Sequence, residues 1–167
     1  DEKIVVGKSN LNLTNYDCLI FCARNAKDPI IPSFIEHISS CSFDCCEQLE
    51  SIEFSNDSKI KTIDNKAFQF SSIKNIKIPL SVILIGESAF CSCKKLESIE
   101  IPNDSKIQTI DKETFIETGL KRIRIPSSVI SIGESAFAEC EDFESIEITD
   151  DSKLQTIEKD AFNESAI

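Results

Sequence analysis

The hexapeptide LESIEI at Leu96–Ile101 decides the fold, because close variants of it recur along the chain. The acidic copies are LESIEF at Leu49–Phe54 and FESIEI at Phe143–Ile148, and the basic copies are IKNIKI at Ile73–Ile78 and LKRIRI at Leu120–Ile125. Alternate residues of a β-strand point to opposite faces. The pattern therefore predicts strands whose first, fourth and sixth residues face a core and whose charged residues face outward.

The hexapeptides belong to longer repeats. Pro32, Pro79 and Pro126 recur at a spacing of 47 residues, which splits into units of 23 and 24 residues. Repeats of this length are typical of leucine-rich repeats. We expect the repeats to span residues 32–167, with the last one incomplete, and residues 1–31 to form an N-terminal cap or a degenerate first repeat. The segment TNYDCLIFCARN within that cap is a candidate short helix. A phenylalanine marks one position of seven successive units and predicts an internal spine: Phe21, Phe43, Phe68, Phe90, Phe115, Phe137 and Phe162.

The repeat resembles that of one family. The pattern L-x-x-I-x-I-P-x-S-V-x-x-I-G-x-x-A-F-x-x-C fits both LKRIRIPSSVISIGESAFAEC (Leu120–Cys140) and IKNIKIPLSVILIGESAFCSC (Ile73–Cys93). It closely resembles the BspA-like leucine-rich repeat family. The resemblance implies an α/β-type solenoid, a right-handed superhelix with a short-stranded parallel sheet on its concave face and mostly irregular or short helical convex segments. It also implies surface or secreted proteins of mucosal bacteria and protists, often linked to adhesion.

One feature of leucine-rich repeats is missing, the asparagine three residues after the last apolar strand position. Asp57, Ser81, Asp104, Ser128 and Asp151 stand there instead. We expect these short side chains to accept hydrogen bonds from backbone N–H groups in the turns.

The outward charges alternate in sign from strand to strand. Stacked parallel strands lie about 4.8 Å apart, so equivalent positions form ladders in which each charge neighbours the opposite one. Because a slip by one unit would place Glu beside Glu, the alternation is interpreted first as a device that fixes register. The two ladders are Glu50, Lys74, Glu97, Lys121 and Glu144, and Glu53, Lys77, Glu100, Arg124 and Glu147.

The same outward positions are the candidate binding site. Six Glu stand against five Lys or Arg, so the concave face is nearly neutral and suits a protein or peptide ligand. The predicted site adds a middle column of Ser51, Asn75, Ser98, Arg122 and Ser145 to the two charge ladders.

Composition excludes several other partners. The formal net charge of -11 disfavours nucleic acid and anionic membrane surfaces, because both bind proteins with an excess of Lys and Arg. No apolar run approaches the ~20 residues that a membrane-spanning helix needs. We therefore expect no membrane insertion by this segment.

No residue pattern predicts catalysis, a metal or a cofactor. Cys46, Cys93 and Cys140 occupy one repeat position and are expected to be buried in the solenoid wall. A disulfide among the N-terminal cysteines, or less plausibly a zinc site, stays open. His37, the sole histidine, is expected in an exposed convex or turn position with no catalytic partner. The leading function is a non-enzymatic adhesive or host-contact module at the cell surface, and the alternative is a cytoplasmic interaction scaffold.

Two further expectations concern modification and assembly. Sequons for N-glycosylation start at Asn12, Asn56, Asn103 and Asn163. Ile167 stands at the first position of a basic hexapeptide, so the strand at Phe143–Ile148 lacks its next neighbour. We therefore expect a longer natural solenoid or end-to-end self-association of two chains.

Overall fold

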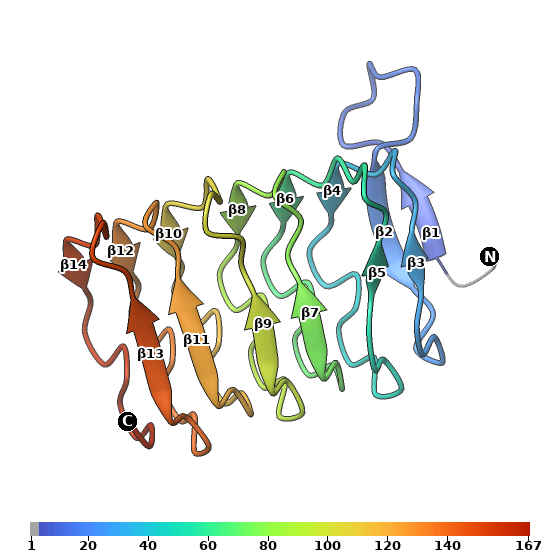
Figure 1. Cartoon of the computed structure of the whole chain (residues 1–167). Helices are drawn as coiled ribbons and strands as arrows, with labels where there is room; N and C mark the ends of the chain where they lie inside the picture. Colours follow the sequence, from blue (N-terminus) through green and yellow to red (C-terminus); the bar gives the residue numbers. More distant parts are fainter. Residues whose placement is uncertain (1–3) are drawn as a thin grey trace.

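The chain winds into a β-solenoid, which the computed structural model describes over residues 4–167 (Figure 1). The coils place strands on two faces and a turn on a third side. The strands are β1 (Ile4–Gly7), β2 (Cys18–Cys22), β3 (Ile30–Ile31), β4 (His37–Ile38), β5 (Glu53–Phe54), β6 (Thr62–Ile63), β7 (Asn75–Lys77), β8 (Leu84–Ile85), β9 (Ser98–Glu100), β10 (Thr109–Ile110), β11 (Arg122–Ile125), β12 (Ser131–Ile132), β13 (Ser145–Ile148) and β14 (Thr156–Ile157).

The hexapeptides form the first face, as predicted. Strands β7, β9, β11 and β13 make one parallel sheet, and β3 pairs in parallel with β5. The register is that of the repeat, since Ile76 lies opposite Ile99 and Lys77 opposite Glu100. We name the outward side of these strands the hexapeptide face. Its inward residues are largely buried, except in β13 at the outer edge of the sheet, where Ile148 is 43% exposed.

The second face corrects the predicted architecture. Residues 4–167 contain no helix, and the expected irregular or helical convex segments instead carry short parallel strands. Together with β1 and β2 they form two sheets, whose strand orders are β1-β2-β4-β6-β8 and β10-β12-β14. Their β-branched residues favour strands over helices. The glycines that follow β8 and β12 allow close approach of coils, because a Cβ at Gly86 would lie 2.8 Å from the backbone nitrogen of Asn65.

The third side is a turn that the sequence did not predict. Each turn holds two residues at positive φ, four apart, as at Ser88 and Ser92, and none of them is glycine. Non-glycine residues adopt this conformation at a cost. Hydrogen bonds between coils offset it, because alternate N–H groups donate to the next coil, for example Phe68 N to Ala89 O at 2.8 Å and Phe90 N to Thr114 O at 2.9 Å.

The predicted phenylalanine spine fills the solenoid. Successive rings from Phe43 to Phe137 are fully buried and stack, with centroid separations of 4.7 Å between Phe43 and Phe68 and 5.0 Å between Phe68 and Phe90. Phe162 continues the stack at 5.3 Å from Phe137. Phe21 does not belong to it: this ring is 44% exposed.

The N-terminal segment also departs from its prediction. TNYDCLIFCARN contains strand β2 rather than a helix, with Leu19 and Cys22 buried and Ile20 and Phe21 exposed. Strand β1 runs antiparallel to β2 and pairs along it. Because every other paired strand is parallel, β1 covers the outer edge of β2 in the manner of a cap. The prediction of an N-terminal cap or a degenerate first repeat over residues 1–31 stays a prediction.

Candidate functional site

The residues of the predicted site lie together on the hexapeptide face. Their side chains project from β5, β7, β9, β11 and β13, or from the residues just before these strands. Most are exposed, whereas Glu50 and Ser51 are half-buried. Middle-column residues also contact one another, since Ser98 donates a hydrogen bond to Asn75 Oδ1 at 2.6 Å.

The charge ladders form ion pairs at alternate rungs. Glu50 pairs with Lys74 at 2.9 Å, and farther along the same ladder Lys121 pairs with Glu97 at 3.1 Å. In the second ladder Lys77 pairs with Glu100 at 2.9 Å and Arg124 with Glu147 at 3.2 Å. Within the two ladders, each paired residue thus contacts one ladder neighbour, and Glu50 also pairs with Lys27 of the preceding coil.

Three charged residues of the face are left over. Within residues 4–167, Glu53, Arg122 and Glu144 have no ion-pair partner. All three are exposed, and two of them, Glu53 and Arg122, line the hollows described below. They are therefore available to a ligand without breaking an existing pair.

The ion pairs of the first ladder change the pKa of Glu50. Hydrogen bonds from Lys74 and Lys27 hold the pKa of its carboxyl below the ordinary value. Lys27 lies 3.0 Å from Glu50 and extends the ladder by one coil beyond the predicted set. Reciprocally, the hydrogen bond to Glu50 raises the pKa of Lys27.

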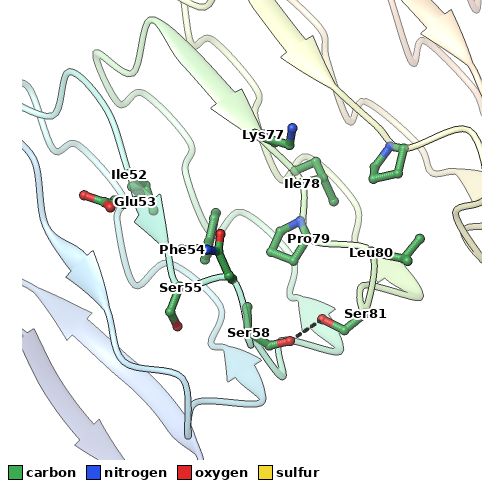
Figure 2. Close-up of a pocket in the computed structure, with 12 residues that line it drawn as sticks. Ile52, Glu53, Phe54, Ser55, Ser58, Lys77, Ile78, Pro79, Leu80 and Ser81 are labelled. Atoms are coloured by element: carbon green, nitrogen blue, oxygen red, sulfur yellow. Dashed lines mark hydrogen bonds between the residues drawn. The ribbon is translucent and has the colours of Figure 1, made fainter.

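A hollow of about 410 Å³ lies where strands β5 and β7 end (Figure 2). Phe54, Pro79 and Leu80 give it an apolar lining, and Glu53 and Lys77 stand at its margin. Leu80 is 49% exposed although it is a large aliphatic residue. The hollow thus offers apolar contact surface beside charges of both signs.

A second hollow of about 560 Å³ lies two coils farther on. It includes Ile101 and Arg124, which are the repeat equivalents of Phe54 and Lys77 in the first hollow. Pro102 borders both hollows, so they are neighbours, and we name the two together the groove. Part of their lining is repeat-equivalent, and sequence reasoning predicted this part only as columns of charge. Six pairs of lining residues are equivalent: Ile52 and Ile99, Glu53 and Glu100, Phe54 and Ile101, Ser55 and Pro102, Asn56 and Asn103, and Lys77 and Arg124.

Serines shape the turns at the groove. The prediction that Ser81 and Ser128 accept from backbone N–H groups is wrong, because they donate to the carbonyls of Ser58 at 3.1 Å and Ile107 at 2.7 Å. The acceptors follow the predicted aspartates by one residue: Ser105 Oγ accepts from Ile107 N at 3.2 Å.

The sequons separate into two groups. Asn56 and Asn103 line the first and second hollows, respectively. Asn12 lies in the loop between β1 and β2, and Asn163 lies in the last turn. Glycans on Asn56 and Asn103 would therefore stand at the groove.

The cysteines and the histidine have structural partners. Cys93 and Cys140 are buried, and their thiols donate to Phe68 O at 3.0 Å and Phe115 O at 3.1 Å. Burial raises the pKa of Cys93 to about 12. His37 lies in β4 and is half-buried, not in an exposed turn, with Nδ1 2.9 Å from Thr62 Oγ1.

In the described part of the chain no three His, Cys, Asp or Glu side chains are grouped so that they could hold a metal. Nor does any helix there have the length and apolarity to cross a bilayer.

The repeat pattern matches the sequence profile of the BspA type leucine rich repeat region, with six copies over residues 14–144 and 61–167. The chain belongs to this family. Leucine-rich repeat proteins are in general non-enzymatic scaffolds for protein interaction. No curated protein sequence matches the chain significantly.

Solved structures share the solenoid fold. The chain is similar to the pneumococcal vaccine antigen PcpA, with a TM-score of 0.69 and 19% identity over 89% of this chain and 48% of that one. It is also similar to a leucine rich cell surface protein from Faecalibacterium prausnitzii, with a TM-score of 0.58 and 21% identity over 88% of this chain and 46% of that one. The chain thus spans about half the length of these two proteins. A Treponema pallidum leucine-rich repeat protein matches with a TM-score of 0.56 and 19% identity over 93% of this chain and 68% of that one.

Proposed function

We propose that this chain is a non-enzymatic binding module of a cell-surface or secreted adhesive protein, and that its hexapeptide face binds a protein or peptide. The observation that carries this proposal is the groove, whose two hollows are lined in part by repeat-equivalent residues. Its apolar lining and charged margins match the chemistry of protein interfaces, which combine an apolar centre with a polar rim. Paired charges beside the groove keep the face nearly neutral, so neither strongly anionic nor strongly cationic ligands are favoured.

Selection from a random peptide display library tests the location of the site. Leu80→Arg with Ser145→Arg places long charged side chains in the two hollows, at residues that are already exposed. The matched control is Ile83→Arg with Ser40→Arg, at exposed residues of the same types outside both hollows. We expect peptides enriched on the natural chain to bind the control and to lose binding to the blocked variant. Equal binding to both variants would reject the proposed site.

A second candidate, a cytoplasmic scaffold with the same face, is favoured by one observation. Buried Cys93 and exposed Cys41 both carry free thiols. Reducing compartments keep cysteines in this state. Thiol titration and glycan mass, measured on protein purified from its source cells, distinguish the two locations. Glycans at Asn56 or Asn103 support secretion from a glycosylating cell, and eight titratable thiols without sugar support the cytoplasm.

End-to-end association of two chains belongs to the same proposal. β13 lies at the outer edge of the hexapeptide sheet, and unpaired strand edges template the addition of further strands. Light scattering over a range of concentrations tests it. Growth of the mean mass with concentration supports association through such an edge, and a constant monomer mass argues against it.

A further inference from the structure

We propose that the groove binds a polyproline II segment, with two residues spaced three apart seated in the two hollows. This inference rests on the proposed function and specifies the ligand. The hollows are repeat-equivalent in part of their lining and two coils apart. At about 4.8 Å per strand, their spacing along the stack is about 10 Å. A ligand that fills both hollows in the same way needs a period close to this value.

The period distinguishes between extended peptide conformations. Polyproline II rises about 3.1 Å per residue with three residues per turn, so every third side chain points the same way at about 9.3 Å. In a β-strand the same face recurs every second residue, at about 6.7 Å, and the third residue points to the opposite face. Of these two extended conformations, only polyproline II places equivalent side chains in both hollows.

Backbone hydrogen bonding points to the same conformation. At the second hollow, β9 and β11 each have a parallel neighbour on both sides. This hollow therefore presents side chains rather than a free strand edge, and a ligand that must add itself to the sheet finds no partner there. Beside the first hollow, β5 and β7 belong to different sheets, but their coils are joined where Lys74 N donates to Glu50 O at 3.0 Å. A polyproline II segment makes no internal hydrogen bonds and docks through apolar contacts, which Phe54, Pro79 and Ile101 supply.

Two of the three unpaired charges line the hollows and define the rest of the ligand. Glu53 lines the first hollow and Arg122 the second, three strands apart in the stack, or about 14 Å. This distance corresponds to between four and five residues of polyproline II at about 3.1 Å each. A ligand with a basic residue near one end and an acidic residue about five positions away would complement Glu53 and Arg122. The partner is thus a proline-rich segment with opposite charges at its two ends.

The probe is acetyl-Pro-Lys-Pro-Pro-Pro-Pro-Glu-Pro-amide, carrying a fluorophore whose anisotropy reports binding. Two comparison peptides replace the four central prolines by Thr-Val-Thr-Val or by Ser-Gly-Ser-Gly. We expect the proline probe to bind about ten-fold more tightly than either, because its conformation is formed before binding. The blocked variant Leu80→Arg with Ser145→Arg should lose binding, and the control Ile83→Arg with Ser40→Arg should keep it. Equal affinity of the three peptides would overturn the inference.

A charge exchange makes the test independent of overall folding. Arg122→Glu should weaken the Lys/Glu probe and strengthen a probe with lysine at both charged positions, each by about five-fold. If affinity is the same for both probes before and after the exchange, the assignment of Glu53 and Arg122 is wrong. Failure of the inference is distinguishable from failure of the proposed function. In the first case library-selected peptides still depend on the groove but are not proline-rich, and in the second no peptide depends on it.

Discussion

Phe90 and Phe115 stack with ring centroids 5.6 Å apart and ring planes 11° apart, and both side chains are fully buried. They belong to different coils, so the contact joins units that bury little surface individually. Truncating Phe90 to alanine should therefore cost about 3–5 kcal/mol, since the stack cannot collapse around the lost ring. Urea unfolding measures this loss. Phe70→Ala serves as control because Phe70 is 52% exposed. A loss below about 1 kcal/mol at Phe90 would contradict the spine.

Reversing the central basic strand should destabilise the fold electrostatically. Lys74→Glu with Lys77→Glu breaks the pairs with Glu50 and Glu100 and places Glu beside Glu. Because exposed pairs each contribute at most about 1 kcal/mol, the total loss should be about 1–2 kcal/mol at low salt. It should shrink at 1 M salt, where the screening length falls to about 3 Å.

The control for this reversal is Lys95→Glu with Lys106→Glu. It changes the net charge equally, and neither lysine is in an ion pair within residues 4–167. Equal destabilisation by the two double variants would show that net charge, rather than the ladder, matters. The register interpretation would then be wrong.

The pKa of Glu50 gives a pH dependence with a definite sign. Hydrogen bonds from Lys74 and Lys27 lower this pKa in the folded chain. A lowered carboxyl pKa stabilises the fold above the unfolded-state pKa, and the stabilisation disappears as the pH falls through the folded-state pKa. Glu50→Gln should therefore be less stable than the natural chain at pH 7, and the difference should vanish in acid. Urea unfolding of both chains from pH 7 into acid checks this prediction. A stability difference that grows in acid would contradict the lowered pKa of Glu50.

Thiol reactivity should follow burial along the chain. The thiolate is the reactive form, and burial raises the pKa of Cys93 to about 12 and also raises that of Cys140. Cys41 is exposed. A brief iodoacetamide pulse at pH 8, read by peptide mass spectrometry, should modify Cys41 and spare Cys93 and Cys140. The same pulse in urea should modify all three; rapid labelling of Cys93 in the folded chain would contradict its place in the wall.

The sequence predicted the features that repeat through side-chain chemistry. The hexapeptide strands, the inward isoleucines such as Ile76 and the buried position of Cys93 follow from alternation and period. The second sheet was missed because its strands, such as Thr62–Ile63, are only two residues long and show no alternation. The turns were missed because ordinary residues such as Ser88 and Glu113 adopt positive φ there. Hydrogen bonds between coils, which leave no local signal, hold that conformation.

The predicted site residues lie on one face, but the groove was not predicted. Columns of outward residues can be derived from strand periodicity. The hollows depend instead on Leu80 and Pro102, which come from the segments after the strands, where strand alternation no longer indicates which side a residue faces. The predictions that Phe21 joins the spine and that TNYDCLIFCARN forms a short helix were wrong for a related reason. The first coil pairs with antiparallel β1, so its residues do not follow the repeat.

The most direct test of the proposed binding face is chemical-shift mapping of the isotope-labelled chain. The ligand is the peptide most enriched from the display library, titrated to saturation. The account predicts shifts concentrated at Phe54, Leu80, Ile101 and Arg122, which border the two hollows, with the amides of β4, β6 and β8 on the second face unchanged. Shifts confined to the second face, with the hollow residues unaffected, would contradict it.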